Sequence, residues 1–357
     1  MIGDQCTTQG STCPVCDSTD VDMFFEILQI PVHCNLLWTT RDEAVQAPRG
    51  DIRLGFCGRC GHIFNLSFDP SLMEYTQEYE NSLHFSPRFQ SYAESLATRL
   101  IERYDLHGKN IIEIGCGKGD FLKLLCELGE NRGIGFDPSY VPEQNGSATA
   151  GRITFIQDFY SKRYASYQAD LICCRQVLEH IQFPRSFLDG VRHAIGDRSG
   201  TAVFFEVPNV SFTLRDLGIW DLIYEHCSYF SAISLSRLFI SCGFEVCDLT
   251  ETYEGQFLCL GALRSGEVAG PMPGFQDELD RMIYDVAAFA DKYRNKIQIW
   301  RRGLERMGRA RQRAVVWGAG SKGVTFLNAL QTQDQIMYAV DINPRKQDKY
   351  LAGTGQQ

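Results

Sequence analysis

The sequence lacks three features: a long hydrophobic run, a leader segment and an excess of positive charge. No apolar run approaches the roughly 20 residues that a transmembrane helix needs. Residues 1–20 hold no basic region followed by an apolar core, the pattern of a secretion signal. The formal net charge is −9 at pH 7, which argues against broad binding to nucleic acid or anionic membranes. We therefore expect a cytoplasmic protein with neither nucleic acid nor membrane as a partner.

Cysteine, by contrast, is abundant, with 14 residues in a chain of 357. Without a secretion signal, we expect these thiols to be reduced core residues or metal ligands rather than disulfides. A hydrophobic content of 44% and a charged content of 22% are typical of a folded soluble protein. The length predicts two or three domains.

The first 70 residues, which we expect to be irregular, carry two C-x-x-C pairs. Each pair can chelate a metal ion through one tight turn, and four thiolates complete the tetrahedral set of a structural zinc site. The predicted ligands are Cys13, Cys16, Cys57 and Cys60. The alternatives are four unligated cysteines, or a set in which one member is replaced by Cys6, His33, Cys34 or His62. A redox role is disfavoured because neither pair follows a βαβ pattern.

The stretch 110–140 is typical of a nucleotide site in a parallel α/β fold. An apolar run that contains Glu113 precedes the turn Gly115-Cys116-Gly117-Lys118-Gly119, and an amphipathic segment then leads to Asp137. Glycines let a ligand approach the backbone, and an acid beyond the second strand accepts hydrogen bonds from a ribose. The spacing differs from the G-x-G-x-x-G of NAD or FAD sites. It resembles motif I of class I S-adenosylmethionine (SAM) methyltransferases; the alternative is an α/β turn without a ligand.

Strands and helices alternate through residues 109–265. Asp158 lies at the end of the third expected strand, where an acid is placed to accept the adenine amino group. Gln176 follows the fourth strand, and Glu206 lies near the end of the fifth. Because ligands of open parallel sheets bind at the carboxyl ends of the strands, we expect these side chains near Gly115 and Asp137. The segment 177–181 resembles the VLEHI of many methyltransferases, which implies that Glu179 and His180 border the site.

The segment 220–231 gathers several titratable side chains just after the fifth strand: Asp221, Tyr224, Glu225, His226 and Tyr229. A histidine beside a carboxylate is a suitable general base, and tyrosines can hydrogen-bond a developing oxyanion. We therefore predict that His226, oriented by Glu225, removes a proton and that Tyr224 or Tyr229 stabilises the resulting enolate. The alternative is a structural histidine in an aromatic segment.

Two connecting regions flank this core. Apolar spacing predicts a helix over 89–104, and Tyr75 and Tyr79 ahead of it could cover the cofactor or pack two lobes together. A Gly- and Pro-rich linker at 264–274 precedes a long predicted helix at 276–307, whose apolar seam suits packing on another lobe or dimerisation. We expect a monomer or a homodimer.

A second glycine turn, Gly318 to Gly323, has the G-x-G-x-x-G spacing and is followed by Asp341 at the end of a strand. Alone it matches the dinucleotide fingerprint and would support an NAD enzyme. Lys322 and the segment 343–346 would suit a pyrophosphate. Only a strand, a helix and a strand are present, so we expect an incomplete Rossmann-like lobe, shortened at the C-terminus.

The order of a two-knuckle zinc lobe, a SAM core and a second glycine-rich lobe resembles the nucleotide-sugar C-methyltransferases of deoxysugar biosynthesis. The resemblance implies a SAM-dependent enzyme that methylates the carbon next to a keto group of a nucleotide-linked sugar. It also implies structural zinc. The departures are Ile223 and Tyr224, where the family reads Tyr-His, and the stretch 255–258, where it reads Gly-Gly-Ser-Leu-Arg.

The predicted fold is therefore α/β, with a class I methyltransferase core, a small zinc lobe and a partial second α/β lobe. The predicted domains are residues 1–75, 76–266 and 267–357. We assign the cofactor to Glu113, Gly115, Cys116, Gly117, Gly119, Asp137, Asp158, Phe159 and Gln176, and the acceptor to His180, Asn209, Lys322 and Arg345. The catalytic candidates are His226, Glu225, Tyr224 and Tyr229. An O- or N-methyltransferase, an NAD-dependent oxidoreductase and a non-catalytic SAM-binding protein are the alternatives.

Overall fold

The computed structural model describes residues 11–73, 80, 82–141, 151–198, 200–265, 274–331 and 335–357. Cys6 and the two tyrosines of the predicted cover, Tyr75 and Tyr79, lie outside these residues. Within the described part of the chain, no helix combines the length and the apolar character needed to cross a membrane.

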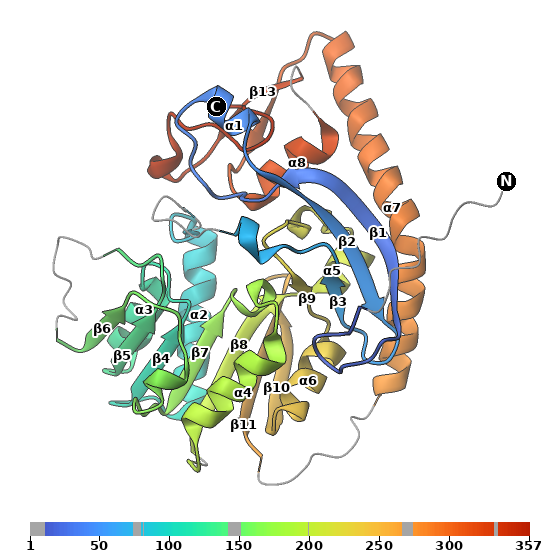
Figure 1. The fold of residues 1–357 in the computed structure, drawn as a ribbon. Coiled ribbons are helices and arrows are strands. Elements are labelled where there is room, and N and C mark those ends of the chain that lie inside the picture. Colours follow the sequence, from blue (N-terminus) through green and yellow to red (C-terminus); the bar gives the residue numbers. More distant parts are fainter. Residues whose placement is uncertain are drawn as a thin grey trace.

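A seven-stranded sheet occupies the lower part of the molecule in Figure 1, in the order β10-β11-β8-β7-β4-β5-β6. Its strands are β4 (Asn110–Ile114), β5 (Arg132–Phe136), β6 (Ile153–Ile156), β7 (Leu171–Arg175), β8 (Ala202–Pro208), β10 (Phe244–Thr252) and β11 (Phe257–Arg264). The five strands from β4 to β8 are parallel, while β11 runs antiparallel to both β8 and β10. The chain leaves β4 towards β5 and returns on its other side as β7, so a crevice is expected at the carboxyl ends of β4 and β7.

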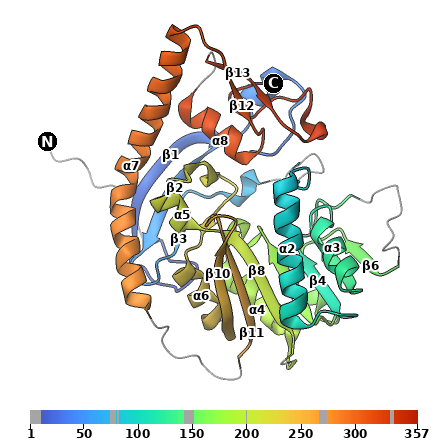
Figure 2. The ribbon, with the colours of Figure 1, turned by 180° about the vertical axis from the view of Figure 1, so that it is seen from behind.

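Helices cover both faces of this sheet (Figure 2). They are α2 (Pro87–Tyr104) and α3 (Asp120–Leu128) on one face, and α4 (Pro184–Ile195) and α6 (Ala232–Ser241) on the other. Successive residues of a strand point to opposite faces. Phe204 accordingly packs with the α2 and α3 side, while Phe205 packs with the α4 and α6 side. This double burial explains the nearly continuous apolar runs of the central strands.

The N-terminal region is an antiparallel sheet, so the expectation that residues 1–70 are irregular is wrong. Its strands are β1 (Val21–Pro31), β2 (Arg49–Cys57), β3 (Ile63–Asn65) and β9 (Ser228–Tyr229), with α1 (Arg41–Val45) between β1 and β2. Side chains of β1 and β2 alternate only in part, because bulges shift the register at Met23–Phe25 and Ile27–Ile30. Strand β9 begins two residues after His226, so the N-terminal lobe and the core share the segment that carries the predicted base.

The predicted helix at 276–307 is confirmed as α7 (Phe275–Arg309), which packs along β1 and the short helix α5 (Val210–Arg215). Figure 1 shows α7 along one side of the molecule, next to β1. The C-terminal lobe holds β12 (Ala314–Trp317), α8 (Ser321–Leu330) and β13 (Ile336–Val340). Strands β12 and β13 form a two-stranded parallel sheet, as the strand–helix–strand pattern predicts.

Candidate active site

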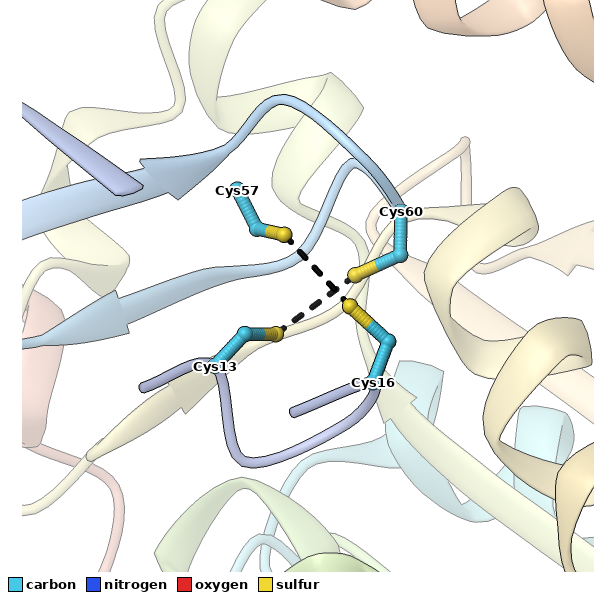
Figure 3. Close-up of side chains that lie close together, drawn as sticks. All are labelled: Cys13, Cys16, Cys57 and Cys60. Carbon is cyan, nitrogen blue, oxygen red and sulfur yellow. Dashed lines mark hydrogen bonds between the residues drawn. The ribbon is translucent and has the colours of Figure 1, made fainter. Parts of the chain in front are cut away.

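The four cysteines of the two C-x-x-C pairs lie close together, with their sulfur atoms facing one another (Figure 3). Cys13 Sγ lies 3.5 Å from Cys60 Sγ, and Cys16 Sγ lies 3.6 Å from Cys57 Sγ. Sulfurs at about 2.3 Å from a tetrahedral zinc ion would be about 3.8 Å apart. The cluster is therefore compatible with zinc, and its four ligands leave no open position.

The three glycines of the first turn all have backbone angles that favour glycine, with φ values of 71° at Gly115, 53° at Gly117 and 80° at Gly119. A Cβ on Gly115 would lie 2.2 Å from Val177 Cγ2, and one on Gly119 would lie 2.3 Å from the Phe155 ring. A Cβ on Gly117 would meet no atom within 4 Å. Other side chains thus pack against Gly115 and Gly119, while the space next to Gly117 is open. A ligand could therefore approach the main chain at Gly117.

Glu113 holds the start of the helix that follows this turn. The residue before α3 is Gly119, which offers no side-chain cap, and the Leu122 amide donates to the Glu113 carboxyl instead. Glu113 is 3% exposed, and burial raises the pKa of its carboxyl to about 8. Cys116 lies beside it, and burial raises the pKa of that thiol as well, so the thiol stays protonated.

The predicted ribose acid, Asp137, contacts the same turn. Asp137 Oδ2 accepts a 2.8 Å hydrogen bond from the Gly117 amide, and Oδ1 accepts from the Ser139 amide at 2.8 Å. Asp158 accepts a hydrogen bond from Tyr164 and forms an ion pair with Arg163. The next residue, Phe159, is 64% exposed, so its ring is accessible for stacking.

Gln176 belongs to a buried polar network at the ends of β7 and β8. Glu206 Oε1 accepts from Arg175 at 3.0 Å and from Gln176 Nε2 at 3.1 Å, and Tyr92 donates to the same carboxylate. The Gln176 backbone has a φ of 54°, an uncommon value for a residue with a side chain. The sequence predicted that Gln176 and Glu206 lie close together. It did not predict the contacts of Tyr92 and Arg175 with Glu206, since neither residue lies in a glycine turn or in a recognised motif.

A cavity of about 530 Å³ lies between the core and the C-terminal lobe. From the core it is lined by Gln176, Glu179, His180, Asp221 and His226, among others. From the C-terminal lobe it is lined by Gly318, Gly320, Lys322, Asp341 and Asn343, among others. The predicted base and the second glycine turn therefore border the same space, although they are about 90 residues apart in sequence.

His226 is 7% exposed, and its Nδ1 has no hydrogen-bond partner among the described residues. Burial and the neighbouring ring of His180, whose centroid lies 4.9 Å away, lower the pKa of His226 well below its ordinary value. The imidazole is therefore neutral at pH 7 and can accept a proton. Burial also raises the pKa of Glu179 to about 8, and its Oε2 has no hydrogen-bond partner among the described residues.

The contacts of the Glu225 carboxylate are with the N-terminal lobe, and not with the His226 ring as the sequence predicted. Its carboxylate accepts from the Cys34 amide at 3.2 Å and lies 3.8 Å from His33 Nδ1, while its main-chain carbonyl lies 2.9 Å from His180 Nδ1. The Glu225 carboxylate therefore ties this segment to the N-terminal lobe, and the Asp221 carbonyl accepts a hydrogen bond from the His226 ring instead.

Both candidate tyrosines use their hydroxyls within the fold. Tyr224 is 1% exposed, and its oxygen accepts from the Asp69 amide at 2.8 Å. Tyr229 donates to the Ile223 carbonyl at 3.1 Å. Neither residue lines the cavity between the core and the C-terminal lobe. The geometry thus gives no direct support to the expectation that one of them stabilises an enolate.

The residues predicted to hold the acceptor are divided. Lys322 lines the cavity, 2.6 Å from Gln256 Oε1 and 3.2 Å from Asp221 Oδ2. Arg345 pairs with Glu80 at 3.1 Å. Asn209 is 3% exposed and donates to the Gly255 carbonyl at 3.0 Å, which makes it a structural contact at the start of α5.

Comparisons with known proteins agree with this architecture. A family model described as a methyltransferase domain matches residues 88–249. A second, described as a C-methyltransferase C-terminal domain, matches residues 276–356.

Among curated proteins, the chain is 31% identical over 114 residues to a ubiquinone biosynthesis O-methyltransferase of Proteus mirabilis, covering 30% of this chain and 46% of that protein. It is 26% identical over 109 residues to the Escherichia coli protein of that name, covering 29% and 45%. The chain thus spans a little under half the length of these relatives.

Two solved structures are also similar. The magnesium protoporphyrin IX methyltransferase of Synechocystis matches at 20% identity with a TM-score of 0.37, over 50% of this chain and 83% of that one. The 1,6-didemethyltoxoflavin-N1-methyltransferase of Burkholderia thailandensis matches at 14% identity with a TM-score of 0.39, over 57% and 96%. The sheet order, the first glycine turn and the two family matches together support a SAM-dependent methyltransferase.

Proposed function

We propose that this protein transfers a methyl group from SAM to the carbon next to a carbonyl group of a nucleotide-linked sugar. The match of residues 276–356 to a C-methyltransferase C-terminal domain supports carbon as the accepting atom. The observation that carries the proposal is the position of His226 Nδ1, a buried nitrogen without a partner among the described residues, at a cavity that also reaches the second glycine turn.

The first glycine turn fits SAM. The space above Gly117 lets a ligand approach the main chain, and Asp137, already oriented by the Gly117 amide, suits the two hydroxyls of a ribose. SAM supplies an electrophilic methyl group on a positively charged sulfonium. The chain then has to position the acceptor and hold the proton that the acceptor loses.

His226 would hold that proton on Nδ1. Its lowered pKa keeps the ring neutral, which a base requires, and the Asp221 carbonyl fixes the orientation of the ring. The same burial makes the free ring a weak base. Negative charge on the acceptor oxygen would favour the imidazolium form, so base strength would develop together with the enolate.

The C-terminal lobe would hold the nucleotide part of the acceptor. The main-chain amides at the start of α8 and the Lys322 ammonium border the cavity beside Gly318 and Gly320. A helix N-terminus that follows a glycine turn is suited to a diphosphate. The acceptor's sugar would then extend towards His226.

The test supplies SAM labelled with ¹³C in its methyl group together with a panel of nucleotide-linked keto sugars. A new methyl signal coupled to a carbon of the sugar is the expected NMR result. In a second assay in D₂O, run without added metal ions, the wild type should exchange the proton next to the keto group. His226→Asn should lose this exchange, while a variant of an exposed histidine, His193→Asn, should keep it.

A methyl group attached to oxygen or nitrogen would contradict C-methylation, and this alternative is favoured by the O-methyltransferase names of the curated relatives. NADH binding at Gly318–Gly323 without SAM binding would favour an oxidoreductase. SAM binding without methyl transfer to any member of the panel would favour a binding protein.

A further inference from the structure

We infer that Glu179, His180 and His226 form a second metal site, which takes a divalent first-row transition ion in the acceptor cavity. The site is distinct from the four cysteines and is formed by the 3₁₀ helix Leu178–His180 and the segment that precedes β9. The inference goes beyond the proposed function and does not depend on it.

The ligand atoms are close to the geometry that such an ion requires. One nitrogen or oxygen of each residue lies within 4.8 Å of the others, and Glu179 Oε1 is 4.0 Å from His180 Nε2. Ligands at about 2.1 Å from a tetrahedral ion are about 3.4 Å apart. Shifts of about 1 Å, within the range of a side-chain adjustment, would therefore close the set.

Each imidazole is also held in the way that metal-binding histidines are. His180 Nδ1 lies 2.9 Å from the Glu225 carbonyl, and the Asp221 carbonyl accepts a hydrogen bond from the His226 ring. A histidine whose one ring nitrogen donates to a carbonyl presents the lone pair of its other nitrogen, in a fixed orientation. The two rings meet edge to face at a centroid distance of 4.9 Å, so these lone pairs can converge on one point.

Two of the three ligands each have one buried polar atom for which the described residues provide no hydrogen-bond partner. Glu179 is 2% exposed and its Oε2 has no hydrogen bond, and His226 is 7% exposed with no bond at Nδ1. Both line the cavity. Buried polar atoms are nearly always paired, so these two indicate a ligand. The nearby Lys322 ammonium lies 3.2 Å from Asp221, which offsets its charge.

The ligand set selects the class of ion. Two imidazoles and one carboxylate suit zinc, iron, cobalt or nickel better than magnesium or calcium, which prefer oxygen ligands alone. Three protein ligands leave a coordination position open towards the cavity. Because the ion and a proton would compete for His226 Nδ1, the loaded site should suppress the proton exchange assigned above to that nitrogen.

The experiment counts zinc per chain by elemental analysis, on protein without a histidine tag, after dialysis against a zinc buffer. We expect two ions in the wild type and one in Glu179→Gln and in His226→Asn, with the thiolate site retained as a control for folding. His193→Asn, which removes an exposed histidine, should keep two. Cobalt in place of zinc adds a second readout, since an N/O site lacks the thiolate charge-transfer bands of the four-cysteine site.

One zinc per wild-type chain would overturn the inference, and so would two in both ligand variants. Should Glu179→Gln fail to fold, His226→Asn and the cobalt spectrum of the wild type still decide. Because metal counting requires neither SAM nor an acceptor, its failure is distinguishable from failure of the proposed reaction.

Discussion

The main-chain amide of Gly117 donates a 2.8 Å hydrogen bond to Asp137 Oδ2, so the carboxylate is oriented by the turn that it is predicted to serve. Hydrogen bonds to a charged group contribute about 1.5–3 kcal/mol. We predict that Asp137→Ala weakens SAM binding by about 10- to 100-fold, measured by isothermal titration calorimetry.

Asp341 supplies the matched control, because it makes the same contacts in the other lobe. Its Oδ2 accepts from the Ala319 amide at 2.7 Å, and its Oδ1 accepts from the Asn343 amide at 2.8 Å. Asp341→Ala should leave SAM affinity within about twofold of the wild type, because the two glycine turns serve different ligands. If Asp341→Ala weakened SAM binding and Asp137→Ala did not, the cofactor would be assigned to the wrong turn.

Loss of the four-cysteine ion should affect the acceptor cavity as well as stability. Strand β3 pairs with β9 at Ile63–Tyr229 and Phe64–Ser228, and β9 begins two residues after His226. We predict that Cys57→Ser lowers the melting temperature by about 5 °C or more, since structural metal sites contribute folding free energy directly. Proton exchange at the acceptor should fall with it. Calorimetry and NMR measure the two effects.

Cys247 is exposed, so Cys247→Ser is the matched control for Cys57→Ser. Cys247→Ser should keep both the melting temperature and the metal content of the wild type. A Cys57→Ser protein that kept its zinc would exclude Cys57 as a ligand.

Tyr224 tests whether a phenol takes part in the chemistry. Its oxygen accepts from the Asp69 amide, and its ring leaves no room for a Cβ at Gly50, where the separation would be 2.3 Å. We predict that Tyr224→Phe lowers the free energy of unfolding by about 0.5–1.5 kcal/mol, since it removes the hydrogen bond from the Asp69 amide. The rate of methyl transfer should change by less than about threefold. A loss of about 100-fold in kcat with unchanged stability would restore the catalytic assignment.

The core was predictable because its signals are local. A buried strand, a glycine turn with positive φ and an acid at the next strand end follow one another within 110–140, and the parallel sheet brings them together whatever the remaining chain does. The thiolate cluster was predictable for the same reason, since each C-x-x-C pair forms its own half of the site.

The acceptor side was less predictable because it depends on long-range contacts. Nothing local indicates that the Glu225 carboxylate reaches the Cys34 amide, 191 positions away in sequence. The role of Tyr224 likewise depends on its burial against β2, a strand in a region expected to be irregular. Adjacent residues of one segment thus serve different lobes, and composition alone does not separate them.

Two buried carboxyls should make stability depend on pH. Burial raises the pKa of both Glu113 and Glu179 from 4.5 to about 8, so the folded protein keeps protons that the unfolded chain releases. The stabilisation is complete below pH 4.5 and is lost as pH rises through 8. Between these values each group should lower the free energy of unfolding by about 1.4 kcal/mol per pH unit. Urea unfolding at several pH values, without added metal ions that would displace the proton of Glu179, measures this slope.

Removing one of the two carboxyls should remove its contribution to the pH dependence of the unfolding free energy. Glu113→Gln cannot titrate, so its unfolding free energy should decline less steeply over the same range, by about 1.4 kcal/mol per pH unit. Glu94 is exposed on α2, and Glu94→Gln should leave the slope of the wild type unchanged because water solvates that side chain in both states. A Glu113→Gln slope equal to that of the wild type would mean that this carboxyl is ionised in the folded protein. In that case the Leu122 amide at the start of α3 would donate to a charged carboxylate. The free energy of unfolding at pH 8 would then be higher than the raised pKa of Glu113 predicts.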